Sequence, residues 1–233
     1  MKQRPSLPPK SLARRVLVGE ARLFAIVAAI LVLSAWSFSY WEGWAFLINF
    51  AVCTVALTAY CACRDPALLE RRMRAGPTAE REPAQKVIQT VNAVAVTGLV
   101  VVPGLDHRWG WSHVPVALNV AGHLMMVASF LGWLLVFREN SFAASTIEVA
   151  AGQHVIDTGP YAVVRHPMYS FALPLFVGVP LALGSYWALL LSLVLMAGIV
   201  ARLLHEERYL DAHLPGYTAY RSQVRWRLIP GVW

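Results

Sequence analysis

Long apolar blocks separated by short polar connectors dominate this chain. The first four blocks are each about 18–24 residues long, enough for a helix rising 1.5 Å per residue to cross a hydrocarbon core of about 30 Å. These predicted spans cover residues 22–40, 44–63, 87–105 and 114–137. Two shorter apolar helices are predicted at 168–183 and 187–203, joined in a hairpin around Gly184-Ser185. The pattern predicts an all-α, polytopic integral membrane protein with about 5–6 transmembrane helices.

The composition agrees with this pattern. Of 233 residues, 58% are hydrophobic and 14% are charged, and the mean hydropathy is +0.53. Soluble domains are usually about 45–50% apolar and about 25% charged. A soluble globular fold is therefore excluded.

The positive charges predict the orientation of the spans. Lys and Arg near span ends are retained on the cytoplasmic side, and only Arg108 of the 20 basic residues falls on the other predicted face. We expect both termini in the cytoplasm, at the inner membrane if the source is bacterial. An aromatic belt is predicted at the opposite interface, made of Trp36, Trp41, Trp44, Trp109 and Trp111.

The net charge of +7 raises the question of nucleic-acid binding. Basic residues spread over several juxtamembrane loops are what topology alone produces, so contact with anionic membrane lipids is the better interpretation. Cys53, Cys61 and Cys63 lack the paired spacing of a zinc site and are odd in number. We therefore expect packing thiols, with no metal and no disulfide.

Two polar segments flank the predicted hairpin and are expected to carry the chemistry. We divide the chain into N-terminal transmembrane helices, residues 1–137, and a catalytic region, residues 138–233. Segments 141–169 and 204–233 are amphipathic and charged, and the hairpin should bring them together at its open end. A cytoplasmic pocket is predicted there.

The first segment ends in Gly159-Pro-Tyr-Ala-Val-Val-Arg-His-Pro-Met-Tyr169. Pro167 suits the first turn of the following helix, because its missing N–H needs no partner there. A helix N-terminus favours anionic groups, and Arg165 and His166 add donors at the same place. In the alternative interpretation Arg165 snorkels to lipid headgroups, His166 caps the helix and Tyr161 and Tyr169 are interfacial anchors.

The second segment places carboxylates at the end of an apolar helix. Arg202 and Glu206 are four residues apart and so lie on one helix face, and ions at such a boundary are by default functional. The alternative is an intrahelical ion pair with Glu207 solvated. Anion donors at one helix end and carboxylates at the other could hold a zwitterion.

Together these motifs resemble the isoprenylcysteine carboxyl methyltransferase family, which is itself similar to the phospholipid methyltransferases. The resemblance covers about residues 138–233 and rests on Gly159-Pro-Tyr-x-x-x-Arg-His-Pro-x-Tyr169, Glu206-Glu207-x-x-Leu210 and Gly216-Tyr217-x-x-Tyr220. It implies a helical membrane enzyme that uses S-adenosylmethionine, enclosed at the cytoplasmic face, and a lipid-like or prenylated acceptor.

The resemblance also implies roles for individual residues. Arg202 matches the substrate arginine, with Arg165 and Glu207 as further catalytic candidates. The residues that match cofactor contacts are Gln153, His154, Val155, Ile156, Tyr161, His166, Pro167, Met168, Tyr169 and Glu206. The family often has histidine where Gln153 stands, so either Gln153 or His154 is expected to face the cofactor. Ser170 stands where many members have glycine.

The expected mechanism depends on the acceptor. A carboxylate is ionised near neutral pH and needs no general base, so Arg202 would orient it. An amine must lose a proton, which would make Glu206 or Glu207 the base.

Other functions stay open at the level of sequence. The chain contains no Gly-x-Gly-x-x-Gly fingerprint, which excludes the soluble doubly wound methyltransferases. The alternatives are a phospholipid N-methyltransferase, a small membrane transporter or a purely structural membrane subunit. A transporter would be favoured if Asn49, Asn92, Asn119 and His123 faced one polar path, although such residues more often hydrogen-bond neighbouring helices.

Overall fold

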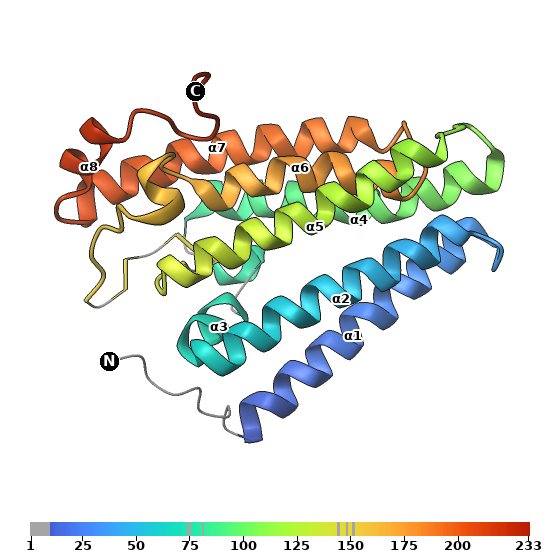
Figure 1. Cartoon of the computed structure of the whole chain (residues 1–233), viewed down its shortest axis with the longest axis horizontal. Helices are drawn as coiled ribbons and strands as arrows, with labels where there is room; N and C mark the ends of the chain where they lie inside the picture. The colour runs from blue at the N-terminus through green and yellow to red at the C-terminus, as the bar shows by residue number, and fades with distance from the viewer. Residues whose placement is uncertain (1–9, 74–75, 81, 144, 148, 151) are drawn as a thin grey trace.

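The protein is a bundle of long helices, seen in a computed structural model that describes residues 10–73, 76–80, 82–143, 145–147, 149–150 and 152–233 (Figure 1). The helices are α1 (Lys10–Ala35), α2 (Trp41–Arg64), α3 (Pro66–Met73), α4 (Pro83–Trp109), α5 (Val116–Glu139), α6 (Pro167–Ala182), α7 (Leu189–His213) and α8 (Tyr217–Gln223). Two 3-10 turns are η1 (Pro77–Ala79) and η2 (Gly159–Ala162). Within the described ranges there is no strand, only one isolated bridge between Val164 and Trp226.

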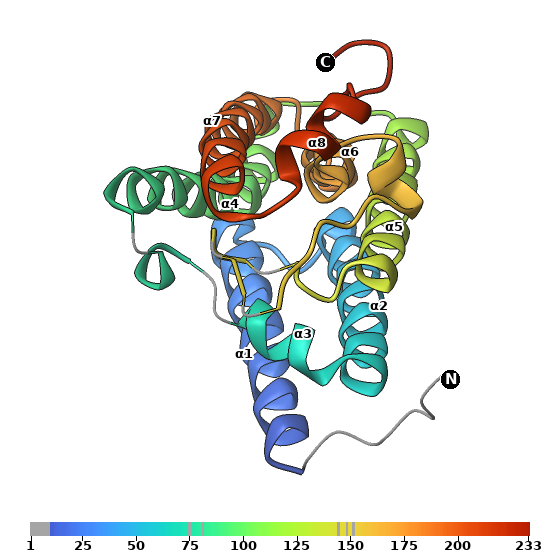
Figure 2. The ribbon, with the colours of Figure 1, turned by 90° about the vertical axis from the view of Figure 1, so that its left-hand side faces the viewer.

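The all-α membrane fold predicted from the sequence is confirmed. Helices α1, α2, α4, α5 and α7 are long and apolar enough to cross a membrane, and α6 is a shorter apolar helix. Viewed along the bundle, α4, α5, α6 and α7 lie together, with α1 and α2 on one side of them (Figure 2). Helix α1 packs on α4, and α2 packs on α5.

Two of the predicted helices have wrong boundaries. The first helix covers Lys10–Ala35, where residues 22–40 were expected, and it ends at Trp36, whose φ of 52° is incompatible with helix. Helix α7 was expected to end at 203 but continues to His213. Polar residues do not interrupt the backbone hydrogen bonds of a helix, so the apolar block ends before the helix does, and Pro215 follows.

Glycines bring α5 and α6 into backbone contact. A Cβ on Gly122 would lie 2.5 Å from the amide nitrogen of Ala182, and one on Gly178 would lie 2.8 Å from the carbonyl oxygen of Gly122. Small residues at such positions let membrane helices approach closely. The division at residue 137 stays a prediction. It falls inside α5, which packs directly on α6, the helix that begins at the site.

Polar residues inside the spans mostly join helices. The Asn49 amide lies 3.1 Å from Nδ1 of His123, and Asn119 donates to the carbonyl of Ala182. Asn92 is different, because its Oδ1 lacks a hydrogen-bond partner and its side chain packs against Gly198 of α7. These contacts tie α2 to α5 and α5 to α6, as expected of packing residues and not of a transport path.

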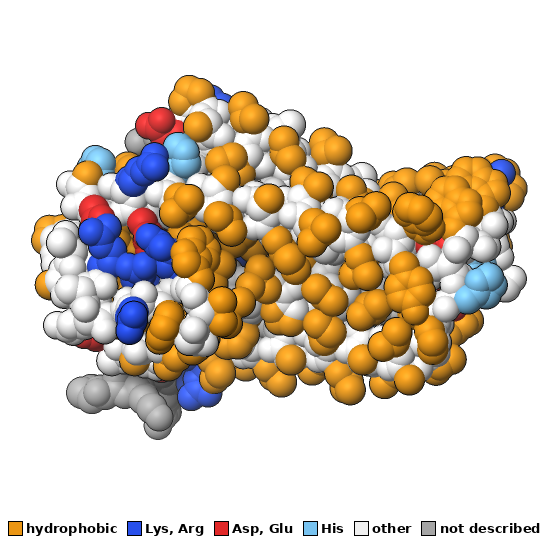
Figure 3. Space-filling model, turned by 90° about the horizontal axis from the view of Figure 1, so that it is seen from above, with side chains coloured by type: hydrophobic (Ala, Val, Ile, Leu, Met, Phe, Trp, Pro, Cys, Tyr) orange, Lys and Arg blue, Asp and Glu red, His pale blue; other side chains and the backbone are white. Residues whose placement is uncertain are grey.

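Charge and apolar surface are separated along the bundle. In Figure 3 the middle is covered by hydrophobic side chains, and Lys and Arg gather at the end that carries α3 and α8. Trp36, Trp41, Trp109 and Trp111 are exposed, at the helix ends where the aromatic belt was predicted. Of the basic residues assigned to the other end, Lys2, Arg4, Arg74 and Arg81 lie outside the described residues. The three cysteines are free thiols.

Candidate active site

The two polar segments meet at the open end of the α6–α7 hairpin, as the sequence predicted. The amides of Arg165 and His166 donate to the carbonyls of Trp226 and Arg227, at 2.9 and 3.0 Å. Ser170 adds a hydrogen bond from Oγ to the carbonyl of Leu228, at 2.6 Å. The C-terminal residues 224–233, which we call the C-terminal strap, therefore lie across the start of α6.

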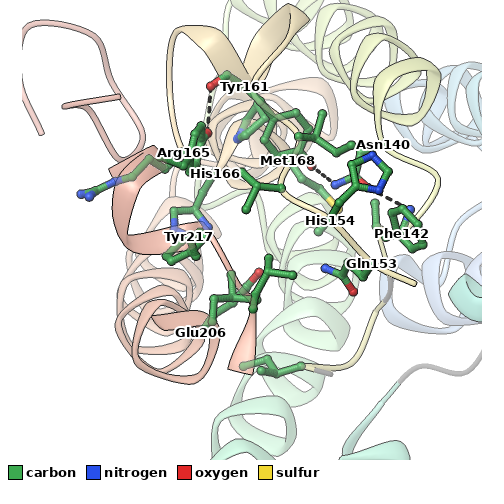
Figure 4. A pocket seen from close by; sticks show the side chains of 18 of the residues that line it. Asn140, Phe142, Gln153, His154, Tyr161, Arg165, His166, Met168, Glu206 and Tyr217 are labelled. Carbon is green, nitrogen blue, oxygen red and sulfur yellow. Dashed lines mark hydrogen bonds between the residues drawn. The ribbon is translucent and has the colours of Figure 1, made fainter. Parts of the chain in front are cut away.

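A cavity opens between these segments, with about 810 Å³ of space that is partly open to solvent (Figure 4). We call it the first cavity. All ten residues expected to contact a cofactor line it: Gln153, His154, Val155, Ile156, Tyr161, His166, Pro167, Met168, Tyr169 and Glu206. His166 and Glu206 thus line one common space.

Local sequence explains how the walls form. Gly159 has a φ of +55°, a left-handed conformation that favours glycine, and it starts the turn that places Tyr161. Pro167 occupies the first position of α6, as predicted. His166 precedes it at the N-cap position, and its side chain makes no capping hydrogen bond. The alternative that His166 caps the helix is therefore confirmed for the position of the residue and wrong for its side chain.

Tyrosines form much of the wall near α8. The Tyr161 hydroxyl accepts a hydrogen bond from Asn140 at 2.8 Å, and the Tyr220 hydroxyl donates to the Tyr161 carbonyl at 2.8 Å. Burial raises the pKa of Tyr161 to about 12. Burial, with the nearby Glu207 and Glu206 carboxylates, also raises the pKa of Tyr217. Both phenols stay protonated at neutral pH, and the buried Tyr217 hydroxyl has no hydrogen-bond partner in the described ranges.

Gln153 and His154 both line the first cavity but differ in their engagement. Gln153 Oε1 accepts a hydrogen bond from the Ala150 amide at 2.9 Å, which fixes the local turn. The His154 ring lies edge-on to Phe142, with 5.4 Å between ring centroids. The question of which one faces the cofactor stays open, since both side chains border the cavity.

Glu207 lies behind the first cavity and not in its lining. Its carboxylate is within 3.1 Å of Arg165 Nε, 3.0 Å of Arg227 Nε and 3.4 Å of His166 Nε2. Glu207 is 4% exposed and Arg165 is 8% exposed. A solvated Glu207 and a snorkelling Arg165 are therefore both wrong expectations.

The ion pair bears on the predicted catalytic roles of Arg165 and Glu207. The two charges neutralise each other, and a buried ion pair of this kind is costly to break. Arg165 lines the first cavity, although in Figure 4 its side chain leads away from the middle of that cavity. The catalytic roles of both residues stay predictions.

A second cavity lies next to the first, between α4, α5, α6 and α7. It encloses about 1270 Å³, again partly open to its surroundings. Its wall is largely apolar and includes Val96, Trp133, Ala172, Phe176 and Ile199. Arg202, the expected substrate arginine, lines this second cavity together with Arg72 and Asn92.

The two cavities share a wall made of Thr146, Met168, Tyr169 and Glu206. The Tyr169 hydroxyl donates to Glu206 Oε2 at 2.6 Å and accepts from Arg202 Nε at 3.0 Å. Arg202 and Glu206 do lie on one helix face, but a tyrosine hydroxyl joins them. The alternative of a simple intrahelical ion pair is therefore wrong.

Sequence reasoning missed the partners that hold Arg202. Glu80 Oε1 lies 2.7 Å from Arg202 Nη1, Gln85 Oε1 accepts from the same nitrogen at 3.1 Å, and the Ser145 carbonyl accepts from Nη2 at 2.8 Å. Glu80 and Gln85 precede and begin α4, more than 100 residues before Arg202 in the sequence. No local pattern predicts that pairing.

Several residues of the first cavity were also missed: Asn140, Phe142, Thr146, Ile147, Leu210, Leu214, Tyr217 and Tyr220. Tyr217 and Tyr220 belong to a family motif quoted above and could have been predicted to share a helix face, because they are three residues apart. The others lie in irregular chain or at helix ends, where periodicity gives no guidance.

Comparison with known families gives one match. Residues 117–215 match the family of phospholipid methyltransferases. This match confirms the resemblance found in the sequence, since the family covers the isoprenylcysteine carboxyl methyltransferase type. It extends from the start of α5 to just beyond α7 and so includes both helices of the hairpin. A search of curated proteins finds no match.

The match supports a membrane methyltransferase, a class that generally uses S-adenosylmethionine as methyl donor. The residues of the first cavity fit such a molecule. Glu206 offers a carboxylate to an ammonium group, the start of α6 favours a carboxylate, and Phe142, Val155 and Leu214 offer apolar surface to a base. Across the described ranges, no group of three or more His, Cys, Asp or Glu could hold a metal ion.

Proposed function

We propose that this membrane methyltransferase transfers a methyl group from S-adenosylmethionine, in the first cavity, to the carboxylate of a lipid-like acceptor in the second. The observation that carries the proposal is the wall that both cavities share, with Glu206 and Tyr169 in it. Two ligands in neighbouring cavities that share lining residues can bring their reacting groups together.

Each side of this wall has a distinct assignment. Glu206 and the start of α6 would hold the amino-acid part of S-adenosylmethionine, and Tyr217 would contact it with its unpartnered hydroxyl. When bound there, S-adenosylmethionine supplies a methyl group on a positively charged sulfur, which keeps the electron pair of the broken S–C bond.

The residues of the second cavity would hold and orient the acceptor. Arg202 is a buried cation that pairs well with a carboxylate. A carboxylate is already ionised near neutral pH, so this site needs no base. The apolar wall of Val96, Phe176 and Ile199 suits the hydrocarbon or prenyl part of a lipid-like acceptor and excludes water from the reacting groups.

A second candidate is N-methylation of a phospholipid amine, and two observations favour it. The matching family is named for phospholipid methyltransferases, and Glu206 borders the second cavity as well as the first. A carboxylate there could accept the proton that an amine must lose. Glu207 is the weaker candidate for this base, because two arginines already neutralise it.

Labelled methyl transfer separates the two candidates. Purified protein would be incubated with methyl-labelled S-adenosylmethionine and either a farnesylcysteine analogue or phosphatidylethanolamine. Carboxyl methylation predicts label in an ester that alkali releases as methanol. Label that alkali does not release as methanol, and that stays on the amine of the phospholipid headgroup, would instead establish the amine acceptor. No transfer to either acceptor would contradict the proposal.

We also infer that the site faces the cytoplasm. Arg165 lines the first cavity, and Arg138 and Arg221 lie in the last turns of α5 and α8, the helix ends beside that cavity. Retained positive charge marks the cytoplasmic side.

A further inference from the structure

Glu80 occupies a place at Arg202 that an acceptor's anionic group would need. Its carboxylate is 2.7 Å from Arg202 Nη1, and the side chains of both residues are almost completely buried. No other ion pair of Glu80 occurs among the described residues. The contact is an ion pair without an aligned hydrogen bond, since Glu80 Oε1 has no hydrogen-bond partner within the described part of the chain.

Arg202 does not need Glu80 to hold its orientation. Three other groups fix the guanidinium, one at each nitrogen: the Tyr169 hydroxyl at Nε, Gln85 Oε1 at Nη1 and the Ser145 carbonyl at Nη2. These partners are neutral, however. A buried guanidinium without a nearby anion is strongly unfavourable, so Glu80 contributes chiefly its charge.

A second observation points to a ligand at the same place. Gln85 is 1% exposed, and its Nε2 has no hydrogen-bond partner among the residues that the structure describes. Buried amide donors without a partner are rare and costly. An anion brought to Arg202 would find this donor on the residue that already contacts the guanidinium.

The segment that carries Glu80 also borders the acceptor cavity. Gly76 and Pro77 line the second cavity, and Glu80 follows η1 in extended conformation, with φ of −78° and ψ of 145°. Glu80 is not part of a long helix, so its carboxylate can leave Arg202 without disturbing a span.

We propose that Glu80 is an exchangeable counterion: it neutralises Arg202 while the acceptor site is empty, and the anionic group of the acceptor replaces it. This inference rests on the proposed function, because it takes the second cavity as the acceptor site. The anionic group could be the carboxylate of a prenylcysteine or the phosphodiester of a phospholipid, which share the chemistry that Arg202 recognises.

The test measures acceptor binding without turnover. Protein saturated with S-adenosylhomocysteine would be titrated with a farnesylcysteine analogue, with its neutral amide and with phosphatidylethanolamine. Glu80→Gln keeps the size of the side chain and removes the competing charge. Glu82→Gln is the matched control, since Glu82 is exposed and makes no capping hydrogen bond.

We expect Glu80→Gln to tighten binding of one anionic acceptor by about tenfold or more, as for close charge pairs elsewhere. The amide should bind equally to both proteins, and Glu82→Gln should behave as wild type. Whichever anionic acceptor is tightened identifies the group that Arg202 recognises. If neither is tightened, or if either binds more weakly to Glu80→Gln, Glu80 is a fixed structural partner and the inference is wrong.

The affinity for S-adenosylhomocysteine is measured separately in the same variants. Unchanged affinity in Glu80→Gln shows that the variant is folded and that the first cavity is intact. If Glu80→Gln binds S-adenosylhomocysteine normally but binds no anionic acceptor more tightly than wild type does, this inference alone is rejected. If wild type does not bind S-adenosylhomocysteine, the proposed function is rejected.

Discussion

At the scale of single residues, the Tyr169 hydroxyl links the two halves of the site. It donates to Glu206 of the shared wall and accepts from Arg202 of the second cavity. One oxygen therefore fixes the orientation of the Glu206 carboxylate and of the Arg202 guanidinium. Hydrogen bonds to charged groups contribute about 1.5–3 kcal/mol each.

Tyr169→Phe should uncouple these two groups without creating a void. We expect the rate of methyl transfer to fall by about tenfold to hundredfold, because both Arg202 and Glu206 lose a hydrogen bond to a charged group. The measurement is turnover with labelled S-adenosylmethionine. Tyr186→Phe, at the other end of the hairpin, is the control, and equal rates for the two variants would contradict the role of Tyr169.

At the scale of elements, the C-terminal strap holds the start of α6. Arg227 reaches Glu207, while the backbone carbonyls of Trp226 and Arg227 accept from the residues before Pro167. Arg225 lies two positions before Arg227 in the sequence. Its side chain makes no ion pair among the described residues and lies over the Trp226 ring, with its Cζ 5.0 Å from the ring centroid. The two arginines therefore form a matched pair for testing the strap.

Arg227→Ala removes one of the two arginines that neutralise buried Glu207. We expect the affinity for S-adenosylhomocysteine to fall by about tenfold, because His166 and the start of α6 lose their support. Isothermal titration calorimetry on Arg227→Ala and Arg225→Ala provides the comparison. An equal affinity in both variants would show that the strap does not position the site.

The α5–α6 contact gives a second prediction at this scale. In Gly122→Ala the added methyl group would meet backbone atoms of α6 at 2.5 and 2.6 Å, so the helices must separate. Overpacking of this kind typically costs about 1–3 kcal/mol. A thermal melt in detergent should show a lower Tm for Gly122→Ala.

The control for this contact is Gly19→Ala. A Cβ on Gly19 would meet no atom within 4 Å, and alanine favours helix over glycine. Its Tm should be unchanged or slightly higher. A Gly122→Ala protein as stable as Gly19→Ala would contradict the close packing of α5 on α6.

Elements and local motifs were predictable to different degrees. The apolar blocks predicted the spans because burial in lipid requires about twenty apolar residues in a row, yet they missed the polar extensions of α1 and α7. Pro167 marked the start of α6 because proline is favoured at that position. The ten residues that the family motifs predict as cofactor contacts all border one cavity, and their role there stays a prediction.

Long-range pairings were not predictable. The burial of Glu207 was not predicted, because nothing near it in the sequence marks Arg227 or Arg165 as partners. The pairing depends on how the strap folds back over α6. Glu80 was missed for the same reason, since it lies 122 positions before Arg202, the difference between their residue numbers. Such contacts follow from the tertiary fold alone.

At the scale of the whole molecule, the separation of charge along the bundle predicts its orientation in the membrane. Arg108 lies in the last turn of α4, next to the exposed Trp109 and Trp111. Arg225 follows α8, whose residues Tyr217 and Tyr220 line the first cavity. In a variant lacking the native cysteines, Arg108→Cys should react with a membrane-impermeant thiol reagent in sealed, right-side-out membranes. Arg225→Cys should react only after lysis, and the reverse pattern would place the site outside the cytoplasm.

The account as a whole depends on Glu206 as a ligand of the cofactor in the first cavity. Calorimetric titration with S-adenosylhomocysteine tests this most directly, with Glu206→Gln compared with wild type and with Asp211→Asn. Asp211 lies on the same helix but pairs with Arg221 outside the cavity. The account predicts affinity about tenfold to a hundredfold weaker in Glu206→Gln and near wild type in Asp211→Asn, whereas equal affinity in all three proteins would contradict it.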